Sequence, residues 1–214
     1  MIIAVDGPTA SGKGTIARAL AAHYGLPHLD TGLLYRAVGY QVLLVGGDPD
    51  SEADALAACS FPAGLLSNPE LRSEATGGLA SRVSVHHAVR EALYERQRAF
   101  ATQASGAVLD GRDIGTVIVP EAGIEVPGAK LFVTASVEAR AKRRYLEMIA
   151  SGREADIDAI AADLAARDER DRNRKEAPLR QADDALLLDN SDLSAQASID
   201  RAIALVESRI TPQR

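Results

Sequence analysis

The sequence predicts an α/β protein, a three-layer α/β/α domain in which helices cover both faces of a parallel, five-stranded sheet. Three observations carry this expectation. Apolar runs of strand length alternate with helix-length patterns, which is typical of parallel strands joined by crossover helices. A glycine-rich turn directly follows the first apolar run. Three runs end in an acidic residue with turn-forming residues behind it, namely Asp6, Asp30 and Asp110, and parallel sheets bind ligands at the carboxyl ends of their strands.

The individual elements follow from the spacing of apolar residues. The expected strands cover residues 2–5, 27–29, 107–109, 130–134 and 185–188. The expected helices cover residues 13–24, 33–45, 85–104, 137–150, 156–172 and 194–209. Residues 47–80 have little periodicity and several Gly, Pro and Asn residues, so we expect an insertion that packs on a single domain of residues 1–214.

The glycine-rich turn has the phosphate-binding pattern G-x-x-x-x-G-K, placed between a strand and a helix. Its glycines let backbone N–H groups converge on phosphate oxygens, and the following helix presents its positive N-terminal end. We therefore expect this loop, a P-loop, to bind a nucleoside triphosphate. The loop residues are Gly7, Pro8, Thr9, Ala10, Ser11, Gly12, Lys13, Gly14 and Thr15.

The residue after Lys13 is Gly14, where many such loops carry the Ser or Thr that contacts Mg²⁺. The hydroxyl group comes one position later, at Thr15, where it suits a phosphate oxygen. Because Mg²⁺ gives up its waters reluctantly, we expect this cofactor to be held mainly by nucleotide phosphates and water. No protein side chain is expected to bind a metal directly.

Polar residues also follow the second and third expected strands. Thr31 is placed to cap the next helix, whose start can bind an anion, and Arg36 lies in the second turn of that helix. Arg112 and Asp113 lie in a turn after a buried strand, where they either pair with each other or serve a ligand. We expect these turns to converge with the P-loop on one cleft.

Residues 167–175 are densely charged. Arg167, Asp171 and Arg174 are spaced i, i+4 and i+7, so they share one helix face that suits a phosphate and a sugar hydroxyl. A solvated face is the alternative. Arg140 and Arg144 form a second i, i+4 pair, whose planar guanidinium groups either cover an aromatic base or face solvent.

Composition limits the possible partners. The net charge is −6 and aromatic residues make up 4% with no Trp, which argues against a nucleic-acid partner bound by charge or base stacking. Residues 140–180 nevertheless hold 11 Lys and Arg against 9 Asp and Glu, which suits a small anionic ligand. No apolar run approaches the ~20 residues of a membrane helix, so no membrane partner is expected.

A single cysteine, Cys59, allows neither an intrachain disulfide nor a cysteine-based zinc cluster. The neighbouring His86 and His87 point about 100° apart on a helix and lack a third ligand, which argues against a metal. The first residues lead directly into a strand without a signal-peptide pattern, so a cytoplasmic protein is expected. We expect it to act as a monomer.

Taken together, the motifs resemble the bacterial cytidylate kinases, a family of nucleoside monophosphate kinases. The resemblance covers nearly the whole chain, and the patterns DGRD-GT and RD-RDRNR-APL are specific to that family. The segments that carry it are VDGPTASGKGT at 5–15, LDTGLLYR at 29–36, ASRVSVHHAVREALYERQRAF at 80–100, LDGRDIGTVIVP at 109–120, ARDERDRNRKEAPL at 166–179 and ALLLDNSDLS at 185–194.

The resemblance implies a donor site for ATP and an acceptor site for CMP. The donor site would consist of the P-loop with Arg140 and Arg144. The acceptor residues would be Thr31 and Arg36 near the monophosphate, Arg112 on phosphate, Ser81, Arg90 and Asp113 at the cytosine edge, Arg167 and Asp171 on the ribose, and Arg174 on the transferring phosphate. The catalytic residues would be Lys13, Arg112 and Arg174.

The resemblance also implies a monophosphate-side insertion at residues 47–80 and a helical lid at residues 151–178. Position 31 has Thr where the family pattern has Ser, a change that keeps the hydroxyl group. The insertion looks shorter than in long members of the family, and the part that looks missing is a small β-rich portion.

The expected reaction transfers the γ-phosphoryl group of ATP to CMP, and also to dCMP, in pyrimidine nucleotide metabolism. One alternative is a kinase of the same fold that acts on UMP or a small metabolite. A second is a non-catalytic nucleotide-binding switch protein, although the D-x-x-G and N-K-x-D motifs of switch GTPases are missing from the sequence. A nucleic-acid-binding ATPase is a third, disfavoured by the acidic net charge.

Overall fold

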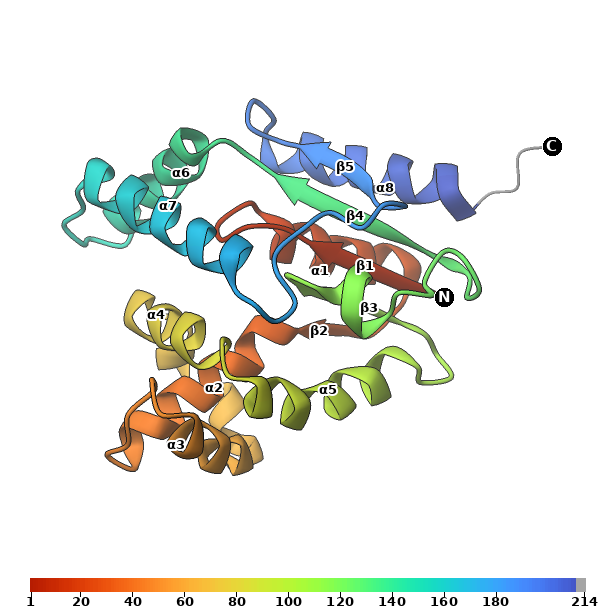
Figure 1. Ribbon diagram of the computed structural model, residues 1–214. Coiled ribbons are helices and arrows are strands. Elements are labelled where there is room, and N and C mark those ends of the chain that lie inside the picture. Colours follow the sequence, from red (N-terminus) through yellow and green to blue (C-terminus); the bar gives the residue numbers. More distant parts are fainter. Residues whose placement is uncertain (211–214) are drawn as a thin grey trace.

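A computed structural model describes residues 1–210 of the protein. Its centre is one parallel sheet of five strands in the order β2-β3-β1-β4-β5 (Figure 1). The strands are β1 (Ile2–Asp6), β2 (His28–Asp30), β3 (Ala107–Gly111), β4 (Gly128–Thr134) and β5 (Leu186–Asp189). Helices flank the sheet on both sides, so the expected three-layer α/β/α fold is confirmed.

Six of the eight helices within residues 1–210 agree closely with those expected from apolar spacing, and α3 and α4 were not expected. They are α1 (Lys13–Tyr24), α2 (Thr31–Leu44), α3 (Glu52–Ala57), α4 (Glu74–Val83), α5 (His87–Ala101), α6 (Val137–Ala150), α7 (Ile157–Asn173) and α8 (Ala195–Ile210). A short π-helical turn, η4 (Ile114–Ile118), follows β3. None of the helices within residues 1–210 is long and apolar enough to cross a membrane.

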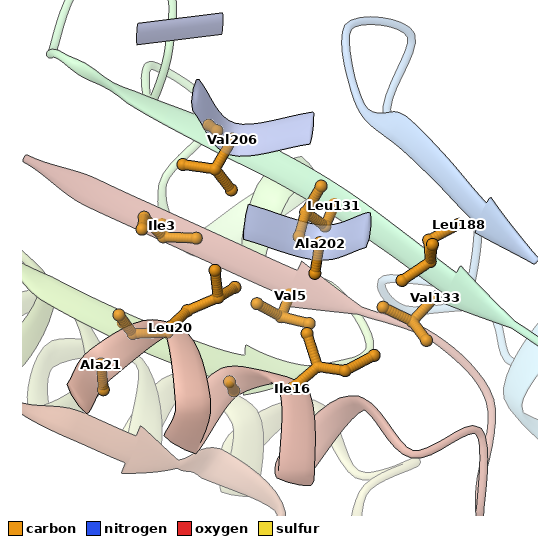
Figure 2. Packing of buried hydrophobic residues seen from close by; sticks show 13 residues of the cluster. Ile3, Val5, Ile16, Leu20, Ala21, Leu131, Val133, Leu188, Ala202 and Val206 are labelled. Atoms are coloured by element: carbon orange, nitrogen blue, oxygen red, sulfur yellow. The ribbon is translucent and has the colours of Figure 1, made fainter. Parts of the chain in front are cut away.

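The apolar run of β1 is buried on both faces, as expected for a central parallel strand. Ile3 and Val5 belong to the core cluster that includes α1 and α8, whereas Ile2 and Ala4 belong to the cluster that includes β3 and η4. Figure 2 shows the first of these clusters, in which α1 and α8 cover the same face of the sheet. The helical residues labelled there are Ile16, Leu20, Ala21, Ala202 and Val206.

One expectation at the start of α2 is wrong. Asp30, rather than Thr31, is the N-cap residue, and its side chain accepts a hydrogen bond from the Leu33 N–H at 3.2 Å. Thr31 is the first helical residue, and its hydroxyl group donates to the Asp110 carbonyl at 2.8 Å. The hydroxyl group therefore joins α2 to β3, because a carboxylate one position earlier already caps the helix.

Residues 47–80, expected to form an insertion and showing little apolar periodicity, contain α3, three short 3₁₀ turns and most of α4. The elements are too short for a clear apolar period, since α3 has 6 residues. This segment packs on α2, where Gly39 allows close approach: a Cβ atom there would lie 2.7 Å from the Leu79 Cβ. Figure 1 shows α4 facing the α6–α7 pair beyond the carboxyl ends of the strands.

Candidate active site

Two adjoining cavities lie at the carboxyl ends of the strands. The larger, of about 820 Å³, is walled by the P-loop, the ends of β2 and β3, the α6–α7 pair and the start of α8. The smaller, of about 90 Å³, is walled by α2, α4, α5, α7 and the turn after β3. We call them the large and the small cavity. They share Thr9, Gly32, Arg36, Gly111, Arg112 and Arg167 and are therefore continuous.

The P-loop runs from the end of β1 to α1 as its sequence predicts. Gly7 has no space for a side chain, because a Cβ atom would lie 2.0 Å from the Val133 carbonyl oxygen. Gly12 has φ +85° and is the N-cap of α1; within residues 1–210 no side chain caps this helix start. The first N–H groups of α1 thus remain available to an anion at the wall of the large cavity.

Most of the predicted P-loop contacts lie in that wall, namely Thr9, Ala10, Gly12, Lys13, Gly14 and Thr15. Ser11 is fully buried behind it, where its carbonyl oxygen accepts from Asn190 Nδ2 at 2.9 Å. Gly7 and Pro8 also lie outside the wall residues. Their part in the site is to shape the loop rather than to face the cavity.

Lys13 is the one loop residue that carries a charge. Its Nζ donates to the Pro8 carbonyl oxygen at 3.3 Å. Burial, and secondarily the neighbouring Arg112, lower the pKa of Lys13 to about 8, against the opposing effect of Asp110. A phosphate group bound next to Lys13 would stabilise the charged form of this side chain.

Of the three acidic strand ends, two face the cavity. Asp30 and Asp110 pair in the β2–β3 register and line the large cavity. His28 Nε2 lies 2.7 Å from Asp110 Oδ1. Asp6 does not line either cavity, which corrects the expectation that all three converge on the cleft: its buried carboxylate accepts the N–H groups of Ile114 and Gly115 at 2.9 and 2.8 Å.

Burial raises the pKa of Asp6 to about 7, despite these two backbone hydrogen bonds. The carboxylate fixes the turn after β3 relative to the strand that enters the P-loop. Its role is therefore to support both parts of the site from behind.

The small cavity brings together all the residues expected to bind the acceptor. They are Thr31, Arg36, Ser81, Arg90, Arg112, Asp113, Arg167, Asp171 and Arg174. These residues come from α2, α4, α5, α7 and the turn after β3, and Arg174 directly follows α7. The two that lie farthest apart in the sequence are Thr31 and Arg174. Arginines predominate, so the cavity suits an anionic ligand.

Asp113 lies between two arginines. Arg90 forms a short ion pair with Asp113, and Arg174 Nη2 lies 3.8 Å from Asp113 Oδ1. Arg90 also lies 5.8 Å from the centre of the Tyr35 ring. Asp113 does not pair with its sequence neighbour Arg112, which pairs with Asp171 instead. Of the two roles that the sequence left open for Arg112 and Asp113, the mutual ion pair is therefore not formed.

Arg174 is a buried cation at the carboxyl end of α7. Its Nε donates to the Ala177 carbonyl oxygen at 2.7 Å, but Nη2 has no hydrogen-bond partner in the described part of the chain. Burial lowers the pKa of Arg174. Arg174 lines only the small cavity, beside Asp113, so it lies on the acceptor side.

The guanidinium groups of Arg36 and Arg167 both lie next to Gly77 of α4. Arg36 Nη1 donates to the Leu71 and Ser73 carbonyl oxygens, both at 2.8 Å, and burial lowers the pKa of Arg36 to about 10. A Cβ atom at Gly77 would lie 2.9 Å from Arg36 Nη2 and 2.9 Å from Arg167 Nη1. The absence of a side chain at this position leaves room for two guanidinium groups at the junction of the cavities.

Arg140 does not occupy the place expected for a residue that covers a base. It is 2% exposed, and its Nη1 and Nη2 donate to Asp168 at 3.1 and 2.6 Å. Nη1 also donates to the Thr9 carbonyl oxygen at 2.9 Å. Because this guanidinium group is buried, no face of it is open for stacking on a ligand. Its hydrogen bonds instead join α6 to α7 and to the P-loop.

Arg144 does line the large cavity. It pairs with Glu74 of α4 at 2.9 Å and with Glu147 of its own helix at 3.6 Å. Two more contacts join α7 to α4: Arg170 Nε donates to Ser81 Oγ at 3.2 Å, and Arg167 Nη2 to the Glu74 carbonyl oxygen at 3.4 Å. The α6–α7 pair therefore touches α4 across the opening of the small cavity.

Several wall residues were not expected from the sequence. In the small cavity they are Tyr35, Gly77, Ala80 and Ser84, and in the large cavity they include Arg143, Asn190, Leu193 and Ser194. Asn190 directly follows β5, so the strand-end argument that selected Asp30 and Asp110 also applies to it. Nothing in the local sequence marks Tyr35 or Gly77, which are defined by helix packing.

Oxygen-bearing side chains lie close to the P-loop, where a Mg²⁺ ion carried by the nucleotide would be held. Within residues 1–210 no cluster of three or more His, Cys, Asp or Glu side chains could hold a metal. Thr15 and Asp110 nevertheless line the large cavity close to the loop, and Asp110 Oδ2 lies 3.5 Å from the Cβ position of Gly14. Such oxygens can hold water ligands of an ion that the nucleotide carries.

A P-loop at the start of the first helix, at the carboxyl edge of a five-stranded parallel sheet and next to an arginine-rich cavity, defines a nucleotide-binding protein of the P-loop class. A crystal structure of an uncharacterised protein from Eubacterium ventriosum has a similar fold, with a TM-score of 0.56 and 16% identity over 97% of this chain and 98% of that one.

The model of the cytidylate kinase family matches residues 3–208, and the chain belongs to this family. The cytidylate kinase of Xanthobacter autotrophicus is 54% identical over 98% of both chains. That of Rhodopseudomonas palustris strain BisB5 is 52% identical over 97% of this chain and 96% of the relative, and that of Bradyrhizobium sp. is 54% identical over the same shares.

Proposed function

We propose that the protein transfers the γ-phosphoryl group of ATP to CMP, and also to dCMP, giving ADP and CDP or dCDP. The observation that carries this proposal is the small cavity, in which nine residues selected from the sequence as acceptor contacts lie together. The full-length similarity to cytidylate kinases supports the same reaction. UMP or a small metabolite as acceptor remains the alternative to be tested.

The P-loop and Lys13 would hold the ATP phosphates, with the base toward the part of the large cavity formed by Arg143 and Leu193. Mg²⁺, when bound to ATP, would neutralise part of the phosphate charge. In this arrangement Thr15 and Asp110 contact the phosphates or the water ligands of the ion. This fits the position of Gly14, which leaves the loop without a direct side-chain ligand.

The chemical step would transfer the phosphoryl group directly, without a covalent intermediate on the protein. An oxygen of the CMP phosphate forms a bond to the γ-phosphorus, and the bond from that phosphorus to the bridging oxygen breaks, so ADP leaves with the electron pair. Lys13 from the large cavity and Arg112 from the junction of the two cavities would stabilise the charge on the moving group. Arg174, which lines the small cavity, would reach the transferring phosphoryl group from the acceptor side as the third catalytic residue.

Base selection is proposed to depend on Asp113. Cytosine presents an exocyclic amino group, for which a carboxylate is a natural acceptor, whereas uracil presents a carbonyl oxygen. Arg90 and Arg174 pair with Asp113 and hold it in the cavity wall. Arg167 and Asp171, from the same face of α7, would contact the ribose.

Two regions would close over the substrates, the insertion at residues 47–80 and the lid at residues 151–178. Closure would exclude water, a competing acceptor for the phosphoryl group. The contact of Arg167 with the Glu74 carbonyl oxygen joins these two regions, and Arg170 also joins the lid to Ser81 near the end of α4. We propose action as a cytoplasmic monomer on free nucleotides.

A coupled assay of ADP release against a panel of acceptors tests the proposal. CMP and dCMP should be accepted, and UMP, AMP and small alcohols should be poor acceptors. ADP release at the same rate without any acceptor would show an ATPase, and a preference for UMP would move the protein to the alternative kinase class. Lys13→Met serves as the control for contaminating kinases.

A further inference from the structure

Thr9 occupies the point where the two cavities meet, and it lines both. Its hydroxyl oxygen accepts a hydrogen bond from Arg112 Nη2 at 2.7 Å. Its carbonyl oxygen accepts one from Arg140 Nη1 at 2.9 Å. One P-loop residue thus contacts an arginine of the small cavity through its side chain and an arginine of α6 through its backbone.

We propose that the Thr9 hydroxyl is a positioning group for Arg112, one that fixes this arginine between donor and acceptor before the substrates arrive. The proposal rests on the proposed function, since it assigns the hydroxyl to the transfer step. It also separates Thr9 from the other loop residues, whose backbone groups are expected to bind ATP.

Arg112 needs such a fixed partner because it lies close to another cation. Lys13 is near enough for Arg112 to lower the pKa of Lys13. Repulsion between the two favours displacement of Arg112 from the junction when no phosphate is present. Asp171 holds Arg112 Nε at 2.8 Å, and Thr9 holds Nη2.

These two anchors leave the third nitrogen of the guanidinium group with little to bind. Arg112 Nη1 makes only a long contact, 3.4 Å, to the Gly111 carbonyl oxygen, as far as residues 1–210 show. A planar group fixed at two corners presents the third in a defined direction. Nη1 is therefore the donor free for a phosphoryl oxygen, and preorganised donors of this kind lower the barrier of a charged transition state.

The loop pattern does not require Thr at this position, since it is one of the four unspecified residues between Gly7 and Gly12. A Val side chain has the same shape and the same restricted χ1 angle but lacks the acceptor oxygen. The backbone contact to Arg140 would be kept in any substitution. Thr9→Val thus removes only the contact to Arg112.

The test compares Thr9→Val and Thr9→Ser, each alone, and Thr9→Val in an Arg112→Ala background. We expect Thr9→Val to lower kcat about five- to tenfold, in line with one charged hydrogen bond partly backed by Asp171. KM for ATP should change less than about twofold. Thr9→Ser, which keeps the hydroxyl, should retain at least about half of the kcat.

In the Arg112→Ala background Thr9→Val should cause no further loss, because the partner of the hydroxyl is already gone. An equal loss in that background would overturn the proposal, as would an unchanged kcat in Thr9→Val. A higher KM for ATP with unchanged kcat would assign the hydroxyl to ATP instead. If Thr9→Val does not fold by circular dichroism, Thr9→Ala replaces it under the same criteria.

Failure of the proposed function gives a different result. In that case the unsubstituted protein would not phosphorylate CMP, whatever the state of position 9. A protein that phosphorylates CMP and is indifferent to Thr9→Val would contradict only the positioning role.

Discussion

The two halves of the site are built in different ways. The P-loop half is formed by nine consecutive residues, and its binding groups are mainly backbone N–H groups with a single charged side chain, Lys13. The acceptor half is formed by side chains from four helices and one turn, and most of them are arginines held by other residues. A local motif can therefore specify the first half, whereas the second exists only once the fold is complete.

The charged side chains of the two halves also differ in the groups that hold them in place. Lys13 has a single hydrogen bond, 3.3 Å long, to a carbonyl oxygen. Arg112 and Arg90 are each paired with a carboxylate, and the acceptor cavity keeps these partners without ligand. A substitution in the first half should remove one function completely, while substitutions in the second half should redistribute contacts and change selectivity.

The largest effect is expected from Lys13→Met. Loss of one preorganised charge at the transferring phosphoryl group should lower kcat by about 10²–10³. The fold should remain intact, because Lys13 forms no ion pair with any of residues 1–210. Steady-state kinetics and a circular dichroism spectrum measure both, and a variant with more than about a tenth of the original kcat would contradict the placement of ATP in the loop.

Asp113→Ala tests the acceptor half. The kcat/KM ratio of CMP to UMP should fall by about 10- to 100-fold, mainly through loss of CMP activity, because the carboxylate that accepts from the cytosine amino group is gone. Kinetics with both acceptors in both proteins provide the measurement. Asp113→Asn keeps the shape and serves as the control for packing around Arg90.

An unchanged ratio in both Asp113 variants would leave this residue with the purely structural role of pairing Arg90 and Arg174. Base selection would then depend on Ser81 and Arg90. Thermal unfolding of the variants distinguishes a lost contact from a damaged cavity, since Asp113→Ala leaves two arginines without their counter-ion.

The pH dependence of ATP binding is a smaller effect and belongs to the P-loop half. Because the pKa of Lys13 is lowered to about 8, the free protein loses this proton as the pH rises above 8. ATP then binds with uptake of a proton, so Kd should increase by up to about fivefold from pH 8 to pH 9. Below pH 7 this residue should cause no pH dependence.

Isothermal titration calorimetry at pH 7, 8 and 9, in buffers of different ionisation enthalpy, measures both the Kd and the proton uptake. Lys13→Met should bind more weakly at pH 7 and lack the uptake near pH 8–9. Equal uptake in the variant would assign the proton to another group.

The smallest effect is expected from Gly77→Ala, compared with Gly78→Ala in the same helix. A Cβ atom at position 77 would meet two guanidinium groups at 2.9 Å, whereas at position 78 nothing lies within 4 Å among residues 1–210. Since the guanidinium groups are ends of flexible side chains, they should shift, and KM for CMP should rise about two- to fivefold. Gly78→Ala should leave KM unchanged and raise stability by up to about 1 kcal/mol through helix propensity.

Acceptor kinetics and thermal melts of the two variants decide the outcome. Equal KM values in Gly77→Ala and Gly78→Ala would show that Arg36 and Arg167 tolerate the extra methyl group without loss of acceptor binding. The spacing of this arginine pair would then not limit CMP affinity.

The sequence was sufficient for the fold because its signals are local. All five strands and six helices were expected within a few residues, since buried parallel strands are short apolar runs and the P-loop marks the first crossover. Within the site, Asp30 and Asp110 were found by their place at strand ends. Their neighbour Asp6 has the same sequence context, yet faces the backbone of η4, a contact that only the finished fold creates.

The helix face of Arg167 and Asp171 was also predictable from spacing alone. Arg140 was not, because its i, i+4 spacing to Arg144 carries no information about Asp168 on a different helix. The choice between base-stacking and burial depended on how α6 and α7 pack together. Tyr35 and Gly77 were missed for the same reason, as their roles depend on neighbours far away in the sequence.

The contacts between α4 and the α6–α7 pair have a consequence for the rates at which the two nucleotides enter their cavities. At about 90 Å³ the small cavity is below the range of about 300–1,000 Å³ typical of ligand sites, so we expect CMP to enter when the contacts of Arg167 and Arg170 with α4 open. The large cavity, at about 820 Å³, is already within that range for ATP. Entry of CMP should therefore reach a plateau with concentration in stopped-flow experiments, at the frequency with which Arg167 and Arg170 release α4, while entry of ATP should keep rising in proportion to its concentration.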